Sequence, residues 1–240
     1  TRQIVSYLEK YFKQKDYLKK KNIKATVTTG PTREYIDPVR YISNESSGKQ
    51  GYEIALELSR LGVKTTLISG PTNINYSKEI KVKEVVSGKQ MLSEVKKNLP
   101  TDIVVCTAAV SDFVPLLKSK QKIKKKLNLS EIKLEKNPDI LEFLGKNNRF
   151  KPKLLVGFSA ETENLLENSI EKMREKHCDI IIANDVSNKE TGFNSEYNEV
   201  IVIDKNGETQ KIKKNSKKFI ASIIAKKIVN SFLDIKKRLN

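Results

Sequence analysis

The sequence predicts an α/β protein built on a doubly wound, mostly parallel sheet with an inserted β-hairpin. Short apolar runs alternate with amphipathic segments along most of the chain, which is the order that βαβ units produce. Residues 102–107 form a nearly continuous apolar run, as expected for a strand buried on both faces of a parallel sheet. A long polar connection at 28–51 follows the first expected strand, at the edge where such sheets bind ligands.

The first half of the chain contains three expected helices and four expected strands. Apolar residues that recur every three or four positions predict helices at 1–22, 52–61 and 89–98. Short apolar runs predict strands at 25–28, 64–69, 81–86 and 102–107. Gly62 follows the second helix, where glycine commonly ends a helix. The sequence Gly-Pro-Thr occurs at 30–32 and again at 70–72, which indicates similar chemistry at two strand ends.

The second half of the chain interrupts this alternation with two hairpins. One has expected arms at 122–126 and 131–136 around Asn128, and the other has arms at 199–204 and 208–212 around the turn Asn206-Gly207. Buried strands are expected at 154–158 and 179–183. Helices are expected to begin at 137–140 and to cover 165–176 and 216–233.

The net charge of +17 over 240 residues raises the possibility of nucleic-acid binding. Only seven of the 46 basic residues are arginine, however, and lysines occur on nearly every segment. Arginine is the favoured residue for reading bases and for gripping phosphate in a fork. A compositional bias toward lysine therefore explains the charge better, and we expect no nucleic-acid partner. The charge should still attract small polyanions such as nucleoside triphosphates.

The sequence argues against a disulfide, a structural zinc site and a membrane-spanning segment. Cys106 and Cys178 each lie in an apolar run, so we expect two reduced core thiols in a cytoplasmic protein. His177 is the only histidine, which argues against a structural zinc site. No apolar run approaches the length that crosses a bilayer. Charge runs at 19–21 and 211–218 are expected to be solvated faces.

The segment Ser46-Ser47-Gly48-Lys49 stands just before the second expected helix, where backbone N–H groups favour an anion. It is not a P-loop, because position 43 is Ser where glycine is required and Gln50 stands where Ser or Thr must bind magnesium. It is not a dinucleotide fingerprint either. Position 46 is Ser, and the strand at 64–69 ends without the acidic residue that holds a ribose.

Polar residues follow several expected strands and should share one edge of the sheet. These residues are Thr32, Arg33, Asp112, Glu161, Asn184 and Asp185. Each alone is more often a cap or turn former, but several in register favour a site. Lysines at 122, 124 and 126 would share one face of a strand, and Lys172 and Lys176 one face of a helix. From spacing alone, solvated surface is the better explanation of both sets.

Taken together, the motifs resemble one family, the phosphopantothenoylcysteine synthetase domain of the bacterial bifunctional coenzyme A biosynthesis protein. The resemblance covers about residues 24–235 in the family's order. The motifs that carry it are Gly30-Pro31-Thr32-Arg33-Glu34, Ile36-Asp37-Pro38-Val39-Arg40, Ile42-Ser43-Asn44, Ser46-Ser47-Gly48-Lys49, Ser69-Gly70-Pro71-Thr72, Ala108-Ala109-Val110, Asp112, Lys122-Ile123-Lys124-Lys125, Lys136-Asn137-Pro138-Asp139-Ile140, Gly157-Phe158, Ala160-Glu161-Thr162, Ala183-Asn184-Asp185-Val186 and Gly192-Phe193. The family's fold is Rossmann-like.

The resemblance implies a ligase that joins 4′-phosphopantothenate to cysteine with CTP and Mg²⁺. The substrate carboxylate would attack the α-phosphate of CTP, giving an acyl-cytidylate and pyrophosphate. The cysteine amine would then displace CMP. ATP in place of CTP is not excluded by the residues themselves, and they do not identify the magnesium ligands.

The resemblance also implies roles for individual residues. Asn44 and Lys122 would be catalytic, Asn44 at the acyl-cytidylate and Lys122 at the triphosphate. The nucleotide-binding residues would be Cys106, Thr107, Ala108, Asp112, Lys122, Asn137, Pro138, Asp139, Ile140, Phe158, Lys172 and Lys176. The residues that bind phosphopantothenate would be Asn44, Ser46, Ser47, Gly48, Lys49 and Ala109.

The sequence departs from the family at three small positions and lacks one large segment. Gln50 replaces a usual Met, and Ser111 and Ser159 each replace a usual Ala. The flavin-dependent decarboxylase half is missing, so we expect residues 1–22 to be a linker helix, residues 23–240 to be the synthetase domain, and no flavin to bind here. The family implies a homodimer in which the hairpin 122–136 reaches over a site. A nicotinamide-dependent reductase and a basic nucleic-acid-binding protein are the alternatives.

Overall fold

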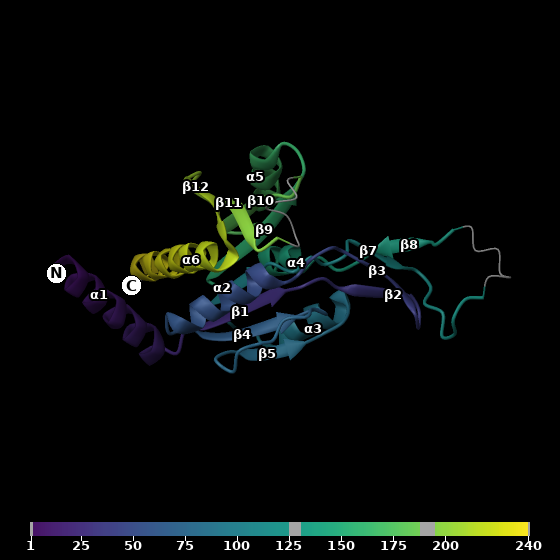
Figure 1. The fold of residues 1–240 in the computed structure, drawn as a ribbon, viewed down its shortest axis with the longest axis horizontal. Helices are drawn as coiled ribbons and strands as arrows, with labels where there is room; N and C mark the ends of the chain where they lie inside the picture. The colour runs from purple at the N-terminus through teal and green to yellow at the C-terminus, as the bar shows by residue number, and fades with distance from the viewer. Residues whose placement is uncertain (1, 125–130, 188–194, 240) are drawn as a thin grey trace.

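The computed structural model describes residues 2–124, 131–187 and 195–239, which form one eight-stranded sheet with helices on both faces (Figure 1). Two further strand pairs lie beside the sheet. The helices are α1 (Arg2–Lys20), α2 (Lys49–Arg60), α3 (Gly88–Lys97), α4 (Ile140–Lys146), α5 (Leu165–Glu175) and α6 (Lys217–Leu239). The strands are β1 (Lys24–Thr29), β2 (Arg33–Asp37), β3 (Arg40–Ser43), β4 (Lys64–Ser69), β5 (Lys81–Glu84), β6 (Ile103–Cys106), β7 (Phe113–Pro115), β8 (Leu134–Lys136), β9 (Leu154–Glu161), β10 (Ile180–Asp185), β11 (Tyr197–Asp204) and β12 (Thr209–Ser216).

The strand order in the large sheet is β12-β11-β10-β9-β6-β1-β4-β5. Six neighbouring strands, from β5 to β10, are parallel, and β11 and β12 extend the sheet as an antiparallel hairpin. Counting only the parallel strands along the chain, the order is third, second, first, fourth, fifth, sixth, which is the Rossmann order. The prediction of a Rossmann-like, mostly parallel sheet is confirmed, and so is the terminal hairpin.

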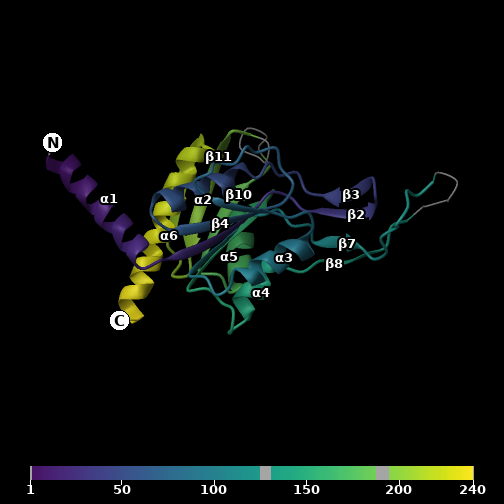
Figure 2. The same ribbon diagram turned by 90° about the horizontal axis from the view of Figure 1, so that it is seen from below.

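Two hydrophobic clusters cover the two faces of the sheet and explain the helix positions. On one face, α2 and α6 contribute Ile54, Leu58, Ile224 and Phe232 to a cluster that also contains Val27 of β1. On the other face, the cluster is built by α3, α4 and α5 (Figure 2). Strands between two such layers need apolar residues on both faces, and the run Ile103–Cys106 satisfies this requirement.

The long connection after β1 is not an irregular loop, as the sequence suggested, but contains the β2–β3 hairpin. Asp37 fixes its turn by accepting hydrogen bonds from the backbone N–H groups of Val39 and Arg40, each at 2.9 Å, and from the Arg40 guanidinium. The Arg40 hydrogen bond, opposed by burial and helped by the backbone donors, holds the pKa of Asp37 well below its usual range. Turn chemistry thus explains this motif.

The predicted pairing of the inserted hairpin is wrong, although its second arm does contain a strand. Leu134–Lys136 forms β8, but its antiparallel partner is Phe113–Pro115 of β7. Residues 122–124 are not in a strand, and residues 125–130, including Asn128, lie outside the described residues, as do Gly192 and Phe193. The β2–β3 and β7–β8 pairs together form an arm that projects from the sheet (Figure 1). The alternation of lysine with apolar residues suggested a strand, but β7 takes the pairing position instead.

The two Gly-Pro-Thr segments pack against each other where β1 and β4 end. A Cβ on Gly70 would lie 1.7 Å from the Pro31 carbonyl oxygen, and a Cβ on Gly30 would lie 2.8 Å from the Thr72 methyl group. Gly30 also has a φ of +75°, which favours glycine. The glycines of the repeated motif therefore allow the backbones of these two segments to pack closely.

The first and last helices meet the body of the domain differently. Helix α1 projects from the sheet over much of its length (Figure 2), but Leu18 near its end is fully buried, and the Tyr11 hydroxyl donates to the Arg60 carbonyl at 3.4 Å. Helix α6 continues to Leu239, six residues beyond its predicted end. Within the described part of the chain, no helix has both the length and the apolar character that a membrane span needs.

We expect Gly70→Ala to lower the free energy of unfolding by about 3 kcal/mol or more, because the new methyl group would overlap the Pro31 carbonyl. Urea unfolding would measure the change. Gly207→Ala is the matched control: its φ is +86° but nothing lies within 4 Å, so only backbone strain of about 1 kcal/mol is added. An equal loss of unfolding free energy in the two variants would contradict the close contact between Gly70 and Pro31.

Candidate functional site

Two adjoining cavities, of about 400 Å³ and 130 Å³, open where β1, β6, β9 and β10 end. This is the edge beside the point where the strand order reverses, where Rossmann-like sheets bind ligands. Both cavities are lined by Ala108, Val110, Asp112, Phe158 and Lys172, so they share a wall. Two molecules bound side by side would meet at this wall.

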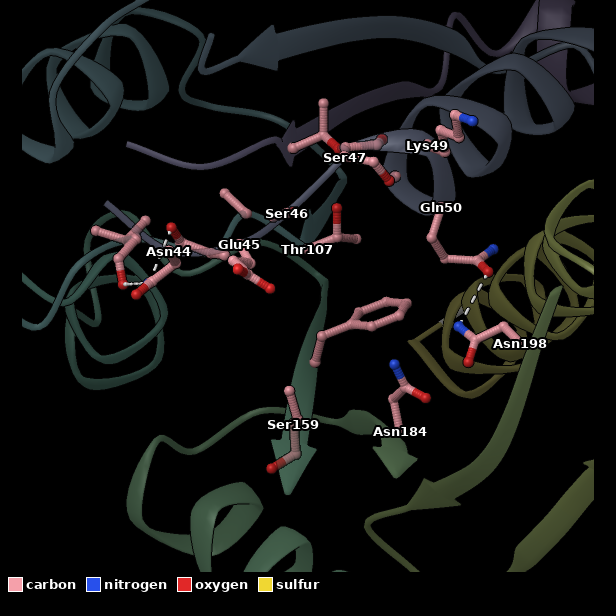
Figure 3. A pocket seen from close by; sticks show the side chains of 18 of the residues that line it. Asn44, Glu45, Ser46, Ser47, Lys49, Gln50, Thr107, Ser159, Asn184 and Asn198 are labelled. Atoms are coloured by element: carbon pink, nitrogen blue, oxygen red, sulfur yellow. Dashed lines mark hydrogen bonds between the residues drawn. The ribbon is translucent and has the colours of Figure 1, made fainter. Parts of the chain in front are cut away.

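The start of α2 forms one side of the larger cavity (Figure 3). Gly48 has a φ of +73°, and no side chain caps the helix there, so its first N–H groups stay available to a ligand. Thr29 donates from its hydroxyl to the Gly48 carbonyl at 2.7 Å. A Cβ on Gly51 would lie 2.0 Å from the Thr107 hydroxyl oxygen. The two glycines let the helix start lie directly against two strand ends, and its dipole favours an anion there.

Asn44 lies across the larger cavity from the start of α2 (Figure 3). Its Nδ2 donates to the carbonyl oxygens of Ala109 at 3.2 Å and Val110 at 3.1 Å. Both acceptors are carbonyls, so they fix the orientation of the amide. The Oδ1 atom remains as an acceptor, and either N–H could turn to a ligand only by giving up a backbone partner.

The smaller cavity is lined by Cys106, Asn137, Pro138, Asp139 and Ile140, which are five of the predicted nucleotide-binding residues. Asn137 donates from Nδ2 to the Ser111 carbonyl at 2.8 Å and to the buried Glu34 carboxylate at 3.1 Å. Asp139 caps α4 by accepting from the Glu142 N–H. These contacts hold the turn rigidly in the cavity wall.

The predicted lysines lie in three different environments. Lys172 lines both cavities. Lys176 lines neither, and its ammonium pairs with Asp139 at 3.1 Å and Glu142 at 3.4 Å. Burial lowers the pKa of Lys176, but its two carboxylate partners outweigh this and leave it above its ordinary value. Lys176 can therefore act on a ligand here only through Asp139.

Lys122 is not brought to either cavity. It lies on the projecting arm, where the neighbouring Ile123 N–H donates to Asp37 and the Ile123 carbonyl accepts from Arg40 at 2.8 Å. The other predicted residues, Thr107 and Ala109 as well as Ser46, Ser47, Gly48 and Lys49, do line the larger cavity.

Several cavity-lining residues were not assigned to the site from the sequence. They are Thr29, Glu45, Gln50, Ser159, Asn198 and Lys217, whereas Asn184, which also lines this cavity, was expected at this edge of the sheet. Lys217 lies in the charge run that was expected to be a solvated face, but it is only 6% exposed. Nothing in the sequence distinguishes it from the other lysines of that run. The Asn184 Oδ1 is buried and has no hydrogen-bond partner among the described residues.

Burial keeps both cysteine thiols protonated. Both cysteines are free, as expected. Burial raises the pKa of the Cys178 thiol to about 11 and raises that of Cys106 even more, so both stay protonated. Among the residues that the structure describes, no group of three or more His, Cys, Asp or Glu is arranged to hold a metal ion. The carboxylates in the larger cavity are Glu45 and Asp112.

The fold and the site together define a Rossmann-like α/β protein whose ligand cavities lie at the carboxyl end of the parallel strands, beside an uncapped helix start. The sequence places it within one such group. Residues 20–232 match the family described as the DNA/pantothenate metabolism flavoprotein C-terminal domain, and the chain belongs to this family.

Relatives agree with this assignment. The chain is 40% identical over 205 residues to the coenzyme A biosynthesis bifunctional protein CoaBC of Borreliella burgdorferi, covering 84% of this chain and 51% of the relative. It is 38% identical over 231 residues to the protein of the same name from Haemophilus influenzae, covering 96% of this chain and 56% of the relative. The chain thus spans about half the length of these curated relatives.

A solved structure supports the fold directly. The crystal structure of the C-terminal domain of a coenzyme A biosynthesis bifunctional protein CoaBC superimposes with a TM-score of 0.75 at 37% identity, covering 88% of this chain and 96% of the other. The family match begins at residue 20, where α1 ends.

Proposed function

We propose that this chain is a phosphopantothenate–cysteine ligase of coenzyme A biosynthesis, which uses CTP to activate 4′-phosphopantothenate. The observation that carries the proposal is the pair of cavities with a common wall. A ligase of this kind must bring a nucleotide phosphate and a substrate carboxylate together, and the common wall is the place where two ligands would touch. The relatives named CoaBC favour this pair of ligands over a nicotinamide cofactor.

In the first half-reaction, a carboxylate oxygen of 4′-phosphopantothenate attacks the α-phosphorus of CTP. The bond to the β-phosphate breaks, and pyrophosphate leaves with the electron pair. Negative charge builds on the phosphate oxygens, so catalysis needs cations and N–H donors fixed in place beforehand. Lys172 at the common wall and the uncapped start of α2 supply such groups.

In the second half-reaction, the unprotonated amine of cysteine attacks the acyl carbonyl, CMP leaves, and the nitrogen loses a proton as the amide forms. Asn44 lies at the cavity wall where the acyl group would lie, held by the two carbonyls of Ala109 and Val110. Its amide can orient the activated group or the incoming amine. This positioning converts an encounter of two molecules into a reaction within one complex.

Mg²⁺ would enter with the nucleotide. Proteins usually hold this ion through one or two carboxylates together with substrate phosphates, and Asp112 and Glu45 of the larger cavity fit that pattern. The ion would supply charge neutralisation on the triphosphate. We place no flavin site in this part of the protein. The flavin chemistry would belong to the preceding half of the longer relatives, and residues 1–22 would link the two halves.

We propose that the projecting arm forms the interface of a homodimer. Its exposed apolar side chains are Val39, Tyr41, Phe113, Leu116, Leu117, Ile132 and Leu134. Leu117 is 83% exposed, and so many large apolar groups on one arm would be costly in water. A second copy that covered them could also place its own Lys122 at the cavities of this copy.

The test of the function is pyrophosphate release from CTP with Mg²⁺ and 4′-phosphopantothenate. Release should require phosphopantothenate, and added cysteine should yield CMP and a cysteine-containing product. Turnover with ATP instead of CTP would keep the ligase and change the nucleotide. No turnover with either, in folded protein, would refute the proposal.

We expect Asn44→Asp to release pyrophosphate while forming little product. The carboxylate cannot donate to Ala109 and Val110, and it would place negative charge beside two carbonyl oxygens and the acyl group. Product formation should fall by about two orders of magnitude, the size typical of losing one transition-state donor. Ser43→Ala is the control, because it removes a neighbouring 2.8 Å hydrogen bond to Thr32. Normal product formation in Asn44→Asp would refute the role.

We expect Lys122→Gln to block pyrophosphate release, although Lys122 lies outside both cavities of its own chain. If the arm serves the partner's site, mixing this variant with Asn44→Asp should restore part of the wild-type activity. Each mixed dimer would then hold one site with an intact Asn44 and an intact Lys122. Mixtures that stay inactive, despite exchange of subunits shown by mass spectrometry, would place Lys122 in its own copy's site.

A further inference from the structure

Glu34 is a buried carboxylate in β2, one strand of the projecting arm. It is only 6% exposed, and N–H donors from two distant segments satisfy it. The backbone N–H of Gly88, the first residue of α3, donates to its Oε1 at 2.8 Å, and Asn137 Nδ2 donates to the same oxygen at 3.1 Å. The helix start also favours negative charge at this place. Glu34 therefore connects the arm with α3 and with the wall of the smaller cavity.

The contact with Glu34 fixes which way the amide of Asn137 faces. The second acceptor of Nδ2 is the Ser111 carbonyl at 2.8 Å, and the Ser111 N–H is itself held by the Thr32 hydroxyl at 3.1 Å. A Cβ on Gly88 would lie 2.5 Å from Nδ2, so this side of the amide is closely packed. Because a carboxylate and a carbonyl can only accept, the NH₂ group must face them and Oδ1 must face away.

The oxygen of the Asn137 amide is left for a ligand. It is buried and has no hydrogen-bond partner among the residues that the structure describes, and an unpaired buried acceptor costs free energy. Asn137 lines the smaller cavity, whose volume of about 130 Å³ is below the roughly 300–1,000 Å³ of pockets that enclose a whole ligand. This cavity therefore suits one part of a nucleotide, the base or the ribose, and both parts carry hydrogen-bond donors.

We propose that Glu34 is a positioning residue of the nucleotide site, which orients Asn137 so that its Oδ1 accepts a hydrogen bond from the nucleotide. The inference rests on the proposed ligase function. The donor is either the exocyclic amine of cytosine or a ribose hydroxyl. Glu34 itself lines neither cavity, so it acts on the nucleotide only through Asn137.

Asn137→Ala tests the contact in the intact protein by calorimetric titration. The affinity for CTP should fall about threefold to tenfold, the range for losing one neutral hydrogen bond, while the affinity for 4′-phosphopantothenate stays constant. If the base amine is the donor, UTP should bind the wild type more weakly than CTP does and should lose nothing further in Asn137→Ala. If a ribose hydroxyl is the donor, 2′-deoxy-CTP or 3′-deoxy-CTP should show this pattern instead. An equal loss for CTP and all three analogues would overturn the contact.

Two variants of Glu34 test the positioning role. Glu34→Met keeps the length of the side chain without an acceptor, and Glu34→Asp keeps the charge at α3 but is one methylene shorter. Both should raise the KM for CTP and leave kcat unchanged, whereas Glu34→Gln, whose amide oxygen can accept both N–H groups, should restore the KM. The double variant Glu34→Met with Asn137→Ala should be no worse than Asn137→Ala alone. Additive losses, or an unchanged KM in both Glu34→Met and Glu34→Asp, would overturn the positioning role.

Glu135→Ala is the matched control. Its carboxylate also reaches α3, where it pairs with the Lys89 ammonium at 3.9 Å, but its side chain is 44% exposed. The KM for CTP should not change in this variant. A rise equal to that of Glu34→Met would assign the effect to charge near α3 and overturn the role of Glu34.

The same titrations separate this inference from the ligase proposal. Protein that binds CTP but releases no pyrophosphate would refute the ligase, while a loss of CTP affinity in Asn137→Ala would still support the contact. An active ligase whose affinity for CTP is the same in the wild type and in Asn137→Ala would overturn this inference alone. Wild-type protein that does not bind CTP would also overturn the contact, and turnover with ATP would then leave the ligase standing.

Discussion

The structure depends most on the close approach of backbone segments where the central strands end. Gly30, Gly48, Gly51 and Gly70 allow two loops, a helix start and two strands to lie almost in contact, with Thr29 and Thr72 filling what space remains. A side chain at Gly48 or Gly51 would collide with Thr72 or with Thr107 and Thr29, and would move the start of α2 away from the strand ends. Because α2 carries the uncapped N–H groups that face the larger cavity, the shape of the site follows from these contacts more than from any catalytic side chain.

Charge is then arranged around that fixed frame. Lys172, Lys49 and Lys217 reach the cavities from α5, α2 and α6, three helices that lie on both faces of the sheet. Some cations in this region are held by acidic partners, as Lys176 is by Asp139. Others face a ligand cavity, as Lys172 does at the common wall. The surplus of +17 across the chain is thus relevant to function only where burial and geometry concentrate it.

Much of this architecture could be predicted from the spacing of apolar residues and from the residues that favour turns. The apolar runs located the inner parallel strands of the large sheet, because a strand between two helical layers must be apolar on both faces. Residues 33–43 were mistaken for a loop because the turn of β2–β3 depends on the carboxylate of Asp37 and not on an Asn-Gly or Asp-Gly pair. Lys217 was missed because a run of lysines gives no sign of which one a helix start turns inward. Local pattern predicts elements well, but which polar groups meet depends on contacts between distant segments.

The position of Lys122 shows why such distant contacts decide function. Resemblance assigns it to the triphosphate, yet its neighbours tie this part of the chain to Asp37 and Arg40 at the far end of the arm. A cation held there can reach a nucleotide only if the arm bends back or if a second copy presents its cavities to it. The exposed apolar side chains on the same arm favour the second arrangement, since the proposed dimer would cover them and would bring the lysine to the partner's cavities. Under this proposal a single copy would lack the Lys122 of its own catalytic site, and assembly would control the first half-reaction.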